Sequence, residues 1–324
     1  MPNWLGDMVM STAFVKAVKE QYPNAVIDLV AKKGIDFLLD YFPAHGRSYV
    51  FSKETNKGIS GLWQFGKAIR KEKKYDIFFC LPDSFSSAVM GYAIAAKKKV
   101  GYKKELRSLL LTSSYTKKKN IHRVEEYTGL LERFIQKEIR VPAVQLISNA
   151  VAKKNALIIN INSEASSRRL PVTKAVSLIS TIRKKIDEEI ILVGSNKEKE
   201  FVDQVYAALP DKAGISNAAG KTNLPQLIDL LASCAVVLTT DSGPAHVANA
   251  LGVHTIVLFG AGNEYNTAPY NKTNRTIIRL GQLPCEPCIS NTCKLYAEPE
   301  CLLRLDEQLI ALEVEKKLKT NFSI

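Results

Sequence analysis

The sequence predicts an α/β protein of two domains, each built on a doubly wound parallel β-sheet with helices on both faces. Short apolar segments rich in β-branched residues alternate along the chain with segments of helical periodicity. This alternation is typical of parallel sheets, in which a helix connects each strand to the next. The chain has 324 residues, which is too long for one ordinary core and fits two domains of roughly 150 residues each.

The first half of the chain begins this alternation. The elements expected there are a helix over 8–21, a strand over 26–31, a buried strand over 77–82 and a helix over 124–137. Residues 141–149 have no strong pattern and are interpreted as a linker. We therefore expect an N-terminal domain over residues 1–150, a C-terminal domain over residues 151–324 and a cleft between them.

The opening strand of the N-terminal domain is missing from this pattern. A doubly wound domain usually places its first strand centrally, and a functional loop follows the end of that strand. Here the loop 3–7 has no apolar strand before it. A gap inside a parallel sheet would leave backbone groups unpaired. We therefore expect that the natural chain starts upstream.

The second half repeats the alternation more clearly. Strands are expected over 156–163, 189–194, 235–240 and 255–260, and helices over 172–186, 197–208, from 224 onward and over 244–251. The final segment, 303–319, has an amphipathic helical pattern. We expect this last helix to pack back on one of the domains, the N-terminal domain included.

The charge balance is strongly basic, with 45 Lys and Arg against 32 Asp and Glu and a net charge of +13. Such a surface attracts phosphates on nucleotides, nucleic acids or anionic membranes, although most lysine clusters are expected to serve solubility alone. The sequence shows neither a signal-peptide pattern nor an apolar run of bilayer length. We therefore expect a cytoplasmic protein that is at most peripheral to a membrane.

The strongest motif is TTDSGPAHVANALG, which spans the end of one strand and the start of a helix. The turn Asp241, Ser242 and Gly243 precedes this helix, so free backbone N–H groups form an anion site there. Gly243 allows close approach of a phosphate, Ser242 offers a hydroxyl, and His246 is placed in the first turn. The simpler alternative is that Asp241 only caps the helix and that His246 lies on the surface.

Three further loops follow the ends of strands. Arg168 is placed to clamp a diphosphate, Glu198 and Glu200 to bind ribose hydroxyls, and Thr222 to contact a nucleotide. The alternatives are a solvated arginine, charged residues in a first helical turn and a helix cap. Because the carboxyl ends of parallel strands meet at one edge of the sheet, together these loops predict one nucleotide diphosphate site.

Asp7 lies directly ahead of the first predicted helix. The simpler interpretation is that its side chain caps the helix. The functional one places Asp7 at the mouth of the cleft, where its carboxylate removes a proton as a general base.

Six cysteines divide into two groups. Cys80 and Cys234 lie in apolar segments, where cysteine acts as a small buried side chain. The other four, called the cysteine cluster below, have the spacing C-x2-C-x4-C-x7-C and are Cys285, Cys288, Cys293 and Cys301. A cytoplasmic chain seldom forms disulfides, so a structural site for zinc or an iron–sulfur centre is one alternative. Reduced packing thiols or an adventitious disulfide are the others.

The motifs together resemble glycosyltransferase family 9, the heptosyltransferases of lipopolysaccharide core synthesis. The matching segments, in the family's order, are PNWLGDMVMS, LPDSFSSA, KVGY, HRVEEY, RRLP, VGSNKEKE, AGKTNL and TTDSGPAHVANALG. The segment of the cysteine cluster is similar to one found near the C-terminus of the second-heptose enzymes. The resemblance covers nearly the whole chain.

The resemblance implies a GT-B architecture of two Rossmann-like domains, with the donor bound to the C-terminal one. The donor would be ADP-L-glycero-β-D-manno-heptose, and the acceptor would be the inner core on lipid A at the inner face of the inner membrane. Transfer would invert the anomeric centre, and Asp7 matches the family's proposed general base. Arg168 stands where relatives commonly carry a lysine. No paired-carboxylate metal motif lies nearby, so we expect neither a metal for transfer nor a cofactor.

Two other functions remain open from the sequence. A nucleotide-sugar epimerase on the same scaffold would need further acid–base carboxylates in the cleft, which the sequence does not reveal. A non-enzymatic protein that binds polyanions would account for the charge, but the alternation of basic and aromatic residues typical of nucleic-acid binding is missing. We therefore expect no nucleic-acid partner.

Overall fold

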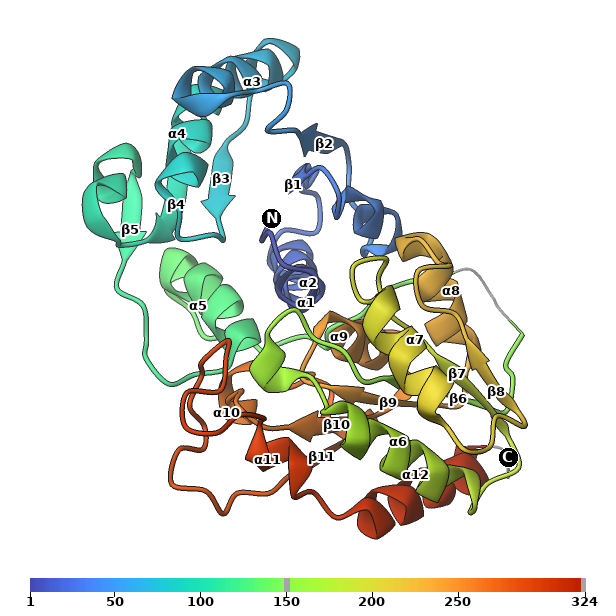
Figure 1. Ribbon diagram of the computed structural model, residues 1–324. Coiled ribbons are helices and arrows are strands. Elements are labelled where there is room, and N and C mark those ends of the chain that lie inside the picture. Colours follow the sequence, from blue (N-terminus) through green and yellow to red (C-terminus); the bar gives the residue numbers. More distant parts are fainter. Residues whose placement is uncertain (149–151, 322–324) are drawn as a thin grey trace. The chain divides into compact units, whose positions relative to one another are not determined.

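The computed structural model describes residues 1–148 and 152–321, which divide into two units, Met1–Val144 and Gln145–Ile324. In both units the paired strands run parallel, as the alternation of strands and helices predicts. Figure 1 shows each unit as a sheet structure flanked by helices. Within the described residues, no helix combines the length and apolar composition needed to cross a bilayer.

The first unit contains two separate sheets, with strand orders β1-β2 and β3-β4-β5. Its strands are β1 (Leu29–Lys32), β2 (Ser48–Phe51), β3 (Ile77–Cys80), β4 (Lys98–Tyr102) and β5 (Ser113–Tyr115). Its helices are α1 (Leu5–Met10), α2 (Thr12–Gln21), α3 (Gly58–Glu72), α4 (Phe85–Ile94) and α5 (Arg123–Ile135), with 3-10 turns η1 (Asp36–Tyr41) and η2 (Glu105–Leu110). Between the two sheets, the Met1 ammonium group donates to the Val30 carbonyl at 2.6 Å and interacts electrostatically with Cys80.

Helices α3 and α4 pack closely together in this unit (Figure 1). Gly66 of α3 makes the approach feasible, because a Cβ atom there would lie 2.6 Å from the Cβ of Ala93. Apolar side chains of both helices and of β2 share one core cluster, namely Phe51, Leu62, Ile69, Val89, Met90 and Ile94. Neither helix is predicted from the sequence, since the buried strand over 77–82 is the only element expected between residues 32 and 123.

The predicted helix 8–21 is two helices, and it begins earlier than expected. Helix α1 starts at Leu5, so Asp7 lies in its first turn, and the N-cap position belongs to Trp4 without a side-chain bond. The break follows Met10, where the hydroxyls of Ser11 and Thr12 donate back to the carbonyls of Met8 and Val9. The interpretation of Asp7 as a helix cap is therefore wrong.

The second unit has one six-stranded sheet with the order β11-β10-β9-β6-β7-β8. Its strands are β6 (Ala156–Asn160), β7 (Glu189–Leu192), β8 (Ile215–Asn217), β9 (Val236–Thr240), β10 (His254–Phe259) and β11 (Arg275–Arg279). The helices are α6 (Val172–Arg183), α7 (Lys199–Ala208), α8 (Leu224–Ser233), α9 (Gly243–Ala250), α10 (Glu264–Thr267), α11 (Glu300–Leu303) and α12 (Glu307–Asn321). The 3-10 turns are η3 (Ser166–Arg168) and η4 (Lys272–Asn274).

Right-handed crossovers distribute these helices over both faces of the sheet. Helices α6 and α7 connect β6 to β7 and β7 to β8, in one direction along the sheet. Helix α8 returns to β9 on the other side of β6, and α9 continues in that opposite direction to β10. Helices α6 and α7 therefore cover one face of the sheet, and α8 and α9 cover the other. The larger core cluster joins α6, α7 and α12 to alternate strand residues such as Leu157 and Leu238. A smaller cluster joins Ala245 of α9 to Val257 and Phe259.

The last predicted helix, 303–319, begins later than expected. Helix α12 starts at Glu307 because Asp306 accepts from the backbone N–H groups of Gln308 and Leu309 at 2.8 and 3.2 Å. The helix packs against α6 (Figure 1). Its residues Ile310, Ala311 and Val314 are fully buried in the larger core of the unit.

Candidate active site

The strand order of the second unit places two loops side by side at one edge of the sheet. Strand β6 leads to β7 and β8 on one side, whereas β9 lies on its other side and leads away to β10 and β11. In the register of this pair Asn160 lies opposite Thr239, so the loops after β6 and β9 start next to each other. Ligands of parallel α/β sheets bind outside the strand ends at such a point of reversal.

Arg168 and Asp241, one from each loop, form an ion pair there. The Arg168 Nη1 and Asp241 Oδ2 atoms are 3.3 Å apart, and Asp241 is only 5% exposed. Burial raises the pKa of the Asp241 carboxyl to about 6, although the charges of Arg168 and Arg279 oppose this increase. Gly262 permits the arrangement, because a Cβ atom at that position would overlap the Asp241 carboxylate. Arg168 is therefore held by a carboxylate that the sequence alone did not pair with it.

The N-terminus of α9 lies at the same edge. Gly243 is its first residue, Pro244 follows, and Ser242 takes the N-cap position without a side-chain capping bond. The interpretation of Asp241 as the helix cap is therefore wrong, because Ser242 holds that position. The backbone N–H groups of the first turn have no partner inside a helix and are suited to an anion.

Asn160 positions this turn, although the sequence analysis did not single it out. Its Nδ2 atom donates to Ser242 Oγ at 2.9 Å and to Thr239 Oγ1 at 3.1 Å. Asn162, two residues further, donates to the Val193 carbonyl at 2.8 Å and so links the end of β7. The available signal was the pair of asparagines in an otherwise apolar strand segment, where buried amides need partners.

His246 lies in α9, four residues into the helix, and is only 6% exposed. The alternative interpretation, a surface histidine, is therefore wrong. It is a buried polar side chain on the helix whose first turn forms the anion site.

The predicted nucleotide contacts lie after the ends of β7 and β8, where the Gly220 N–H donates to the Gly194 carbonyl at 2.9 Å and joins the two connections. Glu198 is half-buried, and its Oε2 atom accepts from the Ser195 N–H at 2.8 Å. Glu200 is exposed in the first turn of α7. Thr222 does not cap α8, because Asn223 occupies that position.

In the first unit, Asp7 is held by two side chains of α5. The Arg123 Nε atom lies 3.4 Å from Asp7 Oδ1, and Tyr127 donates a hydrogen bond to the carboxylate. Burial raises the pKa of the Asp7 carboxyl, whereas Arg123 and Tyr127 act in the opposite direction. The carboxylate is therefore oriented, desolvated and paired with a positive charge.

The pair of Asp7 and Arg123 continues into a charged network of the same unit. Glu126 accepts from Arg123 at 2.7 Å and pairs with Lys117 at 2.7 Å, and Lys117 also pairs with Asp83. Asp83, Arg123 and Glu126 lie in segments that match the family's motifs, but the sequence gives these residues no individual role. Their spacing along the chain gave no signal that they meet.

Most of the second unit and part of the first match a known family model. The model described as glycosyltransferase family 9 (heptosyltransferase) matches residues 62–297. The chain belongs to glycosyltransferase family 9. This finding confirms the resemblance inferred from the motifs, and with it the prediction of an enzyme, a heptosyltransferase.

Members of family 9 from several bacteria align with nearly the whole chain. The lipooligosaccharide heptosyltransferase 2 of Campylobacter jejuni is 26% identical over 332 residues, covering 99% of this chain and 98% of the relative. The solved ADP-heptose lps heptosyltransferase II of E. coli has a TM-score of 0.82 at 24% identity, with 98% and 97% of the two chains covered. The E. coli heptosyltransferase WaaC with ADP has a TM-score of 0.73 at 16% identity, with 98% and 97% covered. These matches confirm the predicted α/β fold with parallel sheets of the GT-B heptosyltransferases.

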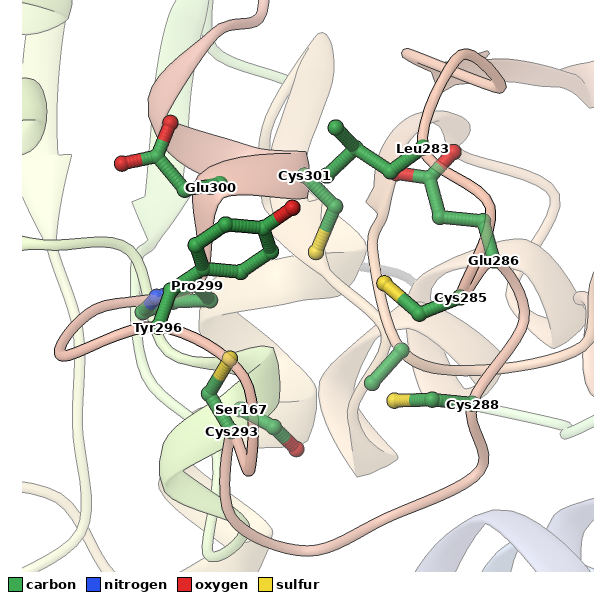
Figure 2. Close-up of a pocket in the computed structure, with 11 residues that line it drawn as sticks. Ser167, Leu283, Cys285, Glu286, Cys288, Cys293, Tyr296, Pro299, Glu300 and Cys301 are labelled. Atoms are coloured by element: carbon green, nitrogen blue, oxygen red, sulfur yellow. The ribbon is translucent and has the colours of Figure 1, made fainter.

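The described part of this family 9 chain contains no preformed metal site. Within residues 1–148 and 152–321, no three His, Cys, Asp or Glu side chains are arranged to hold a metal ion as they stand. The cysteine cluster nevertheless lines a single small pocket of the second unit (Figure 2).

Proposed function

We propose that this enzyme transfers heptose from ADP-L-glycero-β-D-manno-heptose to the inner core of lipopolysaccharide, with inversion, and that it adds the second heptose. The observation that carries the proposal is the Arg168–Asp241 pair beside the N-terminus of α9, at the point where the strand order reverses. The relatives named heptosyltransferase 2 and the bound ADP of WaaC support the choice of donor and step.

The proposed donor site separates the diphosphate from the nucleoside. Arg168 and the amides from Ser242 onward bind the diphosphate, and His246 lies on the same helix. Glu198 and Thr222 contact the nucleoside from the loops after β7 and β8, and Glu200 does so from the first turn of α7. The diphosphate gains negative charge as the glycosidic bond breaks, so these positive groups stabilise the transition state more than the ground state.

The proposed general base is Asp7. Inversion requires a single in-line displacement, in which an acceptor hydroxyl attacks the anomeric carbon opposite the leaving ADP and loses its proton. An ionised carboxylate removes this proton. Arg123 and Tyr127 fix the orientation of Asp7, and the positive charge of Arg123 helps to keep the carboxylate ionised.

The proposed acceptor accounts for the basic character of the chain. Lipid A and its core carry phosphates, and the net charge of +13 favours their approach at the cytoplasmic face of an anionic inner membrane. We propose a peripheral association at that face.

The test is an assay with ADP-heptose and two defined acceptors, one core truncated before the first heptose and one truncated after it. We expect extension of the second acceptor only, with ADP released in equal amount and an inverted linkage in the product. Extension of the first acceptor alone would contradict the step, and conversion of ADP-heptose without any acceptor would support an epimerase instead.

A further inference from the structure

The longest irregular segment of the second unit contains most of the cysteine cluster. Residues 280–299, between β11 and α11, form neither helix nor strand, and Cys301 follows in the first turn of α11. Connections of this length without secondary structure are uncommon in compact domains and usually have a function of their own. Because few backbone hydrogen bonds order such a segment, its side chains must fix its conformation.

All four cysteines of the cluster line one pocket. They line a pocket of about 20 Å³ together with Leu283, Glu286 and Tyr296, and Figure 2 shows their sulfur atoms directed toward the space between them. A volume of roughly 10–15 Å³ holds one water-sized particle, so the pocket has room for a single ion and too little for an iron–sulfur cluster. All six cysteines of the chain, this cluster included, are free thiols in the structure.

Glu286 adds an independent observation. Both of its carboxylate oxygens are buried, and neither has a hydrogen-bond partner within the part of the chain that the structure describes. The same side chain lines the pocket. Burying a carboxyl group without hydrogen-bond partners is costly, and Glu286 lies beside four thiols in this pocket. A bound cation would satisfy these oxygens.

The segment of the cysteine cluster also supports the loop that precedes Arg168. The Ser167 N–H donates to the Asn291 carbonyl at 3.2 Å, and the Ser166 hydroxyl donates to the same oxygen at 3.3 Å. The Ile289 N–H donates to the Ala261 carbonyl at 2.8 Å, one residue before the glycine that contacts Asp241. Ordering this segment therefore fixes both sides of the Arg168–Asp241 pair.

We propose that the cysteine cluster binds one thiophilic divalent cation of the Zn²⁺ type, and that this ion holds segment 283–301 against the loop that positions Arg168. The thiols release their protons and become the ligands, because soft thiolates prefer such ions. Side-chain rotations within the irregular segment bring the sulfur atoms to the roughly 2.3 Å that zinc requires. The ion is structural and takes no part in the transfer of heptose.

The first experiment measures metal content. The full chain is purified without a histidine tag, under reducing conditions and without chelators, and is then analysed for bound metals. We expect about one equivalent of zinc or iron per chain. The double variant Cys288→Ser/Cys293→Ser should lose this metal, while Cys234→Ala, a buried cysteine of the same unit outside the cluster, should retain it.

The proposal does not depend on the double variant folding. If circular dichroism shows that it does not, metal-free wild-type chain is titrated against a chromophoric chelator under reducing conditions, and we expect it to compete for Zn²⁺. A wild-type chain that neither contains metal nor competes overturns the proposal. A disulfide within the cluster, found by mass spectrometry of the freshly isolated chain, does so as well.

The link to Arg168 is tested separately and rests on the proposed function. Removing the metal should weaken ADP binding about tenfold, as loss of supporting groups does at other sites, and restoring Zn²⁺ should reverse the effect. Unchanged ADP affinity would refute the proposed support of Arg168 by the metal-bound segment, but it would not contradict the metal site itself. The metal content is measured without substrate, so this result tests the metal site independently of the proposed transfer reaction.

Discussion

At the residue scale, Asp7 combines burial with a positive partner, which suits a general base. We predict that Asp7→Asn lowers kcat about 10²–10⁴-fold, because the neutral amide of the same size cannot accept the proton. The dissociation constant for ADP should stay within about twofold, since the proposed donor site lies in the other unit. Steady-state kinetics and calorimetry measure the two quantities.

The matched control is Glu20→Gln, which neutralises an exposed carboxylate of α2 in the same unit. Its turnover should equal that of the wild type. If Asp7→Asn retains near-normal turnover, Asp7 is not the base.

Tyr127 acts on Asp7 through a hydrogen bond that lowers the pKa of the carboxyl. We predict that Tyr127→Phe raises this pKa, so that the acidic limb of the kcat/KM profile moves to higher pH. A purely structural role would reduce the rate equally at all pH values, so an unshifted limb would rule out the positioning role.

Asp241 provides a prediction about stability. Its folded-state pKa of about 6 lies above the ordinary value of 3.8, so the folded chain holds this proton more tightly than the unfolded chain does. Stability from this group is therefore fully present below about pH 4 and is lost as the pH rises toward 6. The two-unit difference in pKa corresponds to about 3 kcal/mol.

We therefore predict that the free energy of unfolding of the wild type decreases relative to Asp241→Asn between pH 4 and 7, by up to about 3 kcal/mol. Urea unfolding at several pH values measures it. The control is Asp229→Asn on α8, an exposed carboxylate whose substitution should leave the pH dependence unchanged. Parallel profiles of the wild type and Asp241→Asn would contradict the buried titration.

At the scale of elements, the N-terminus of α8 shows how a local sequence fixes a helix start. Asn223 accepts from the Gln226 N–H, and Gln226 accepts from the Asn223 N–H, each at 2.9 Å. We predict that Asn223→Ala destabilises the second unit by about 1 kcal/mol, because a backbone N–H group loses its partner. Thermal unfolding measures this cost.

Thr222→Ala is the companion variant at the neighbouring position. Its effect on stability should remain within about 0.5 kcal/mol. Because we propose a nucleotide contact for Thr222, this variant should instead weaken ADP binding. The reverse pattern, with loss of stability at Thr222 and none at Asn223, would contradict both assignments.

Sequence periodicity predicted most elements of the second unit and few of the first. Strands β6, β7, β9 and β10 consist mainly of buried apolar residues, so their positions follow from composition, and each ends within three residues of the expected end. The strand β11 escaped prediction because Arg275–Arg279 is polar at both ends and only half-buried. Helix α1 begins at Leu5, before the predicted start at residue 8. Leu5 and Gly6 carry no sequence signal for a helix start, so tertiary packing sets the start of this helix.

At the scale of the whole molecule, the division into two units predicts where the donor acts. We expect ADP to slow amide hydrogen exchange of the full chain in the loops 161–171 and 241–246 and to leave α3 and α4 of the first unit unchanged. Mass spectrometry of peptides from each unit measures this. Protection confined to the first unit would contradict the proposed donor site.

The sequence by itself determined the class of fold, the family and the residues from which the donor site is proposed. Alternating apolar and helical segments specify parallel sheets, because each strand needs a covering connection. Polar and glycine-containing loops after the strands indicated the ligand-binding edge, since that property depends only on chain direction. These features are local and can be read along the chain.

Only the tertiary structure decided which of these loops are neighbours. The order β11-β10-β9-β6-β7-β8 brings Asn160 beside Thr239, and Arg168 then pairs with Asp241. Likewise, the packing of α1 near α5 places Arg123 and Tyr127 on Asp7, and the fold of segment 280–299 gathers the four thiols. These contacts join residues far apart in the chain, and no local periodicity encodes them. Strand pairing and the burial of charge against its partner fix them when the whole core forms.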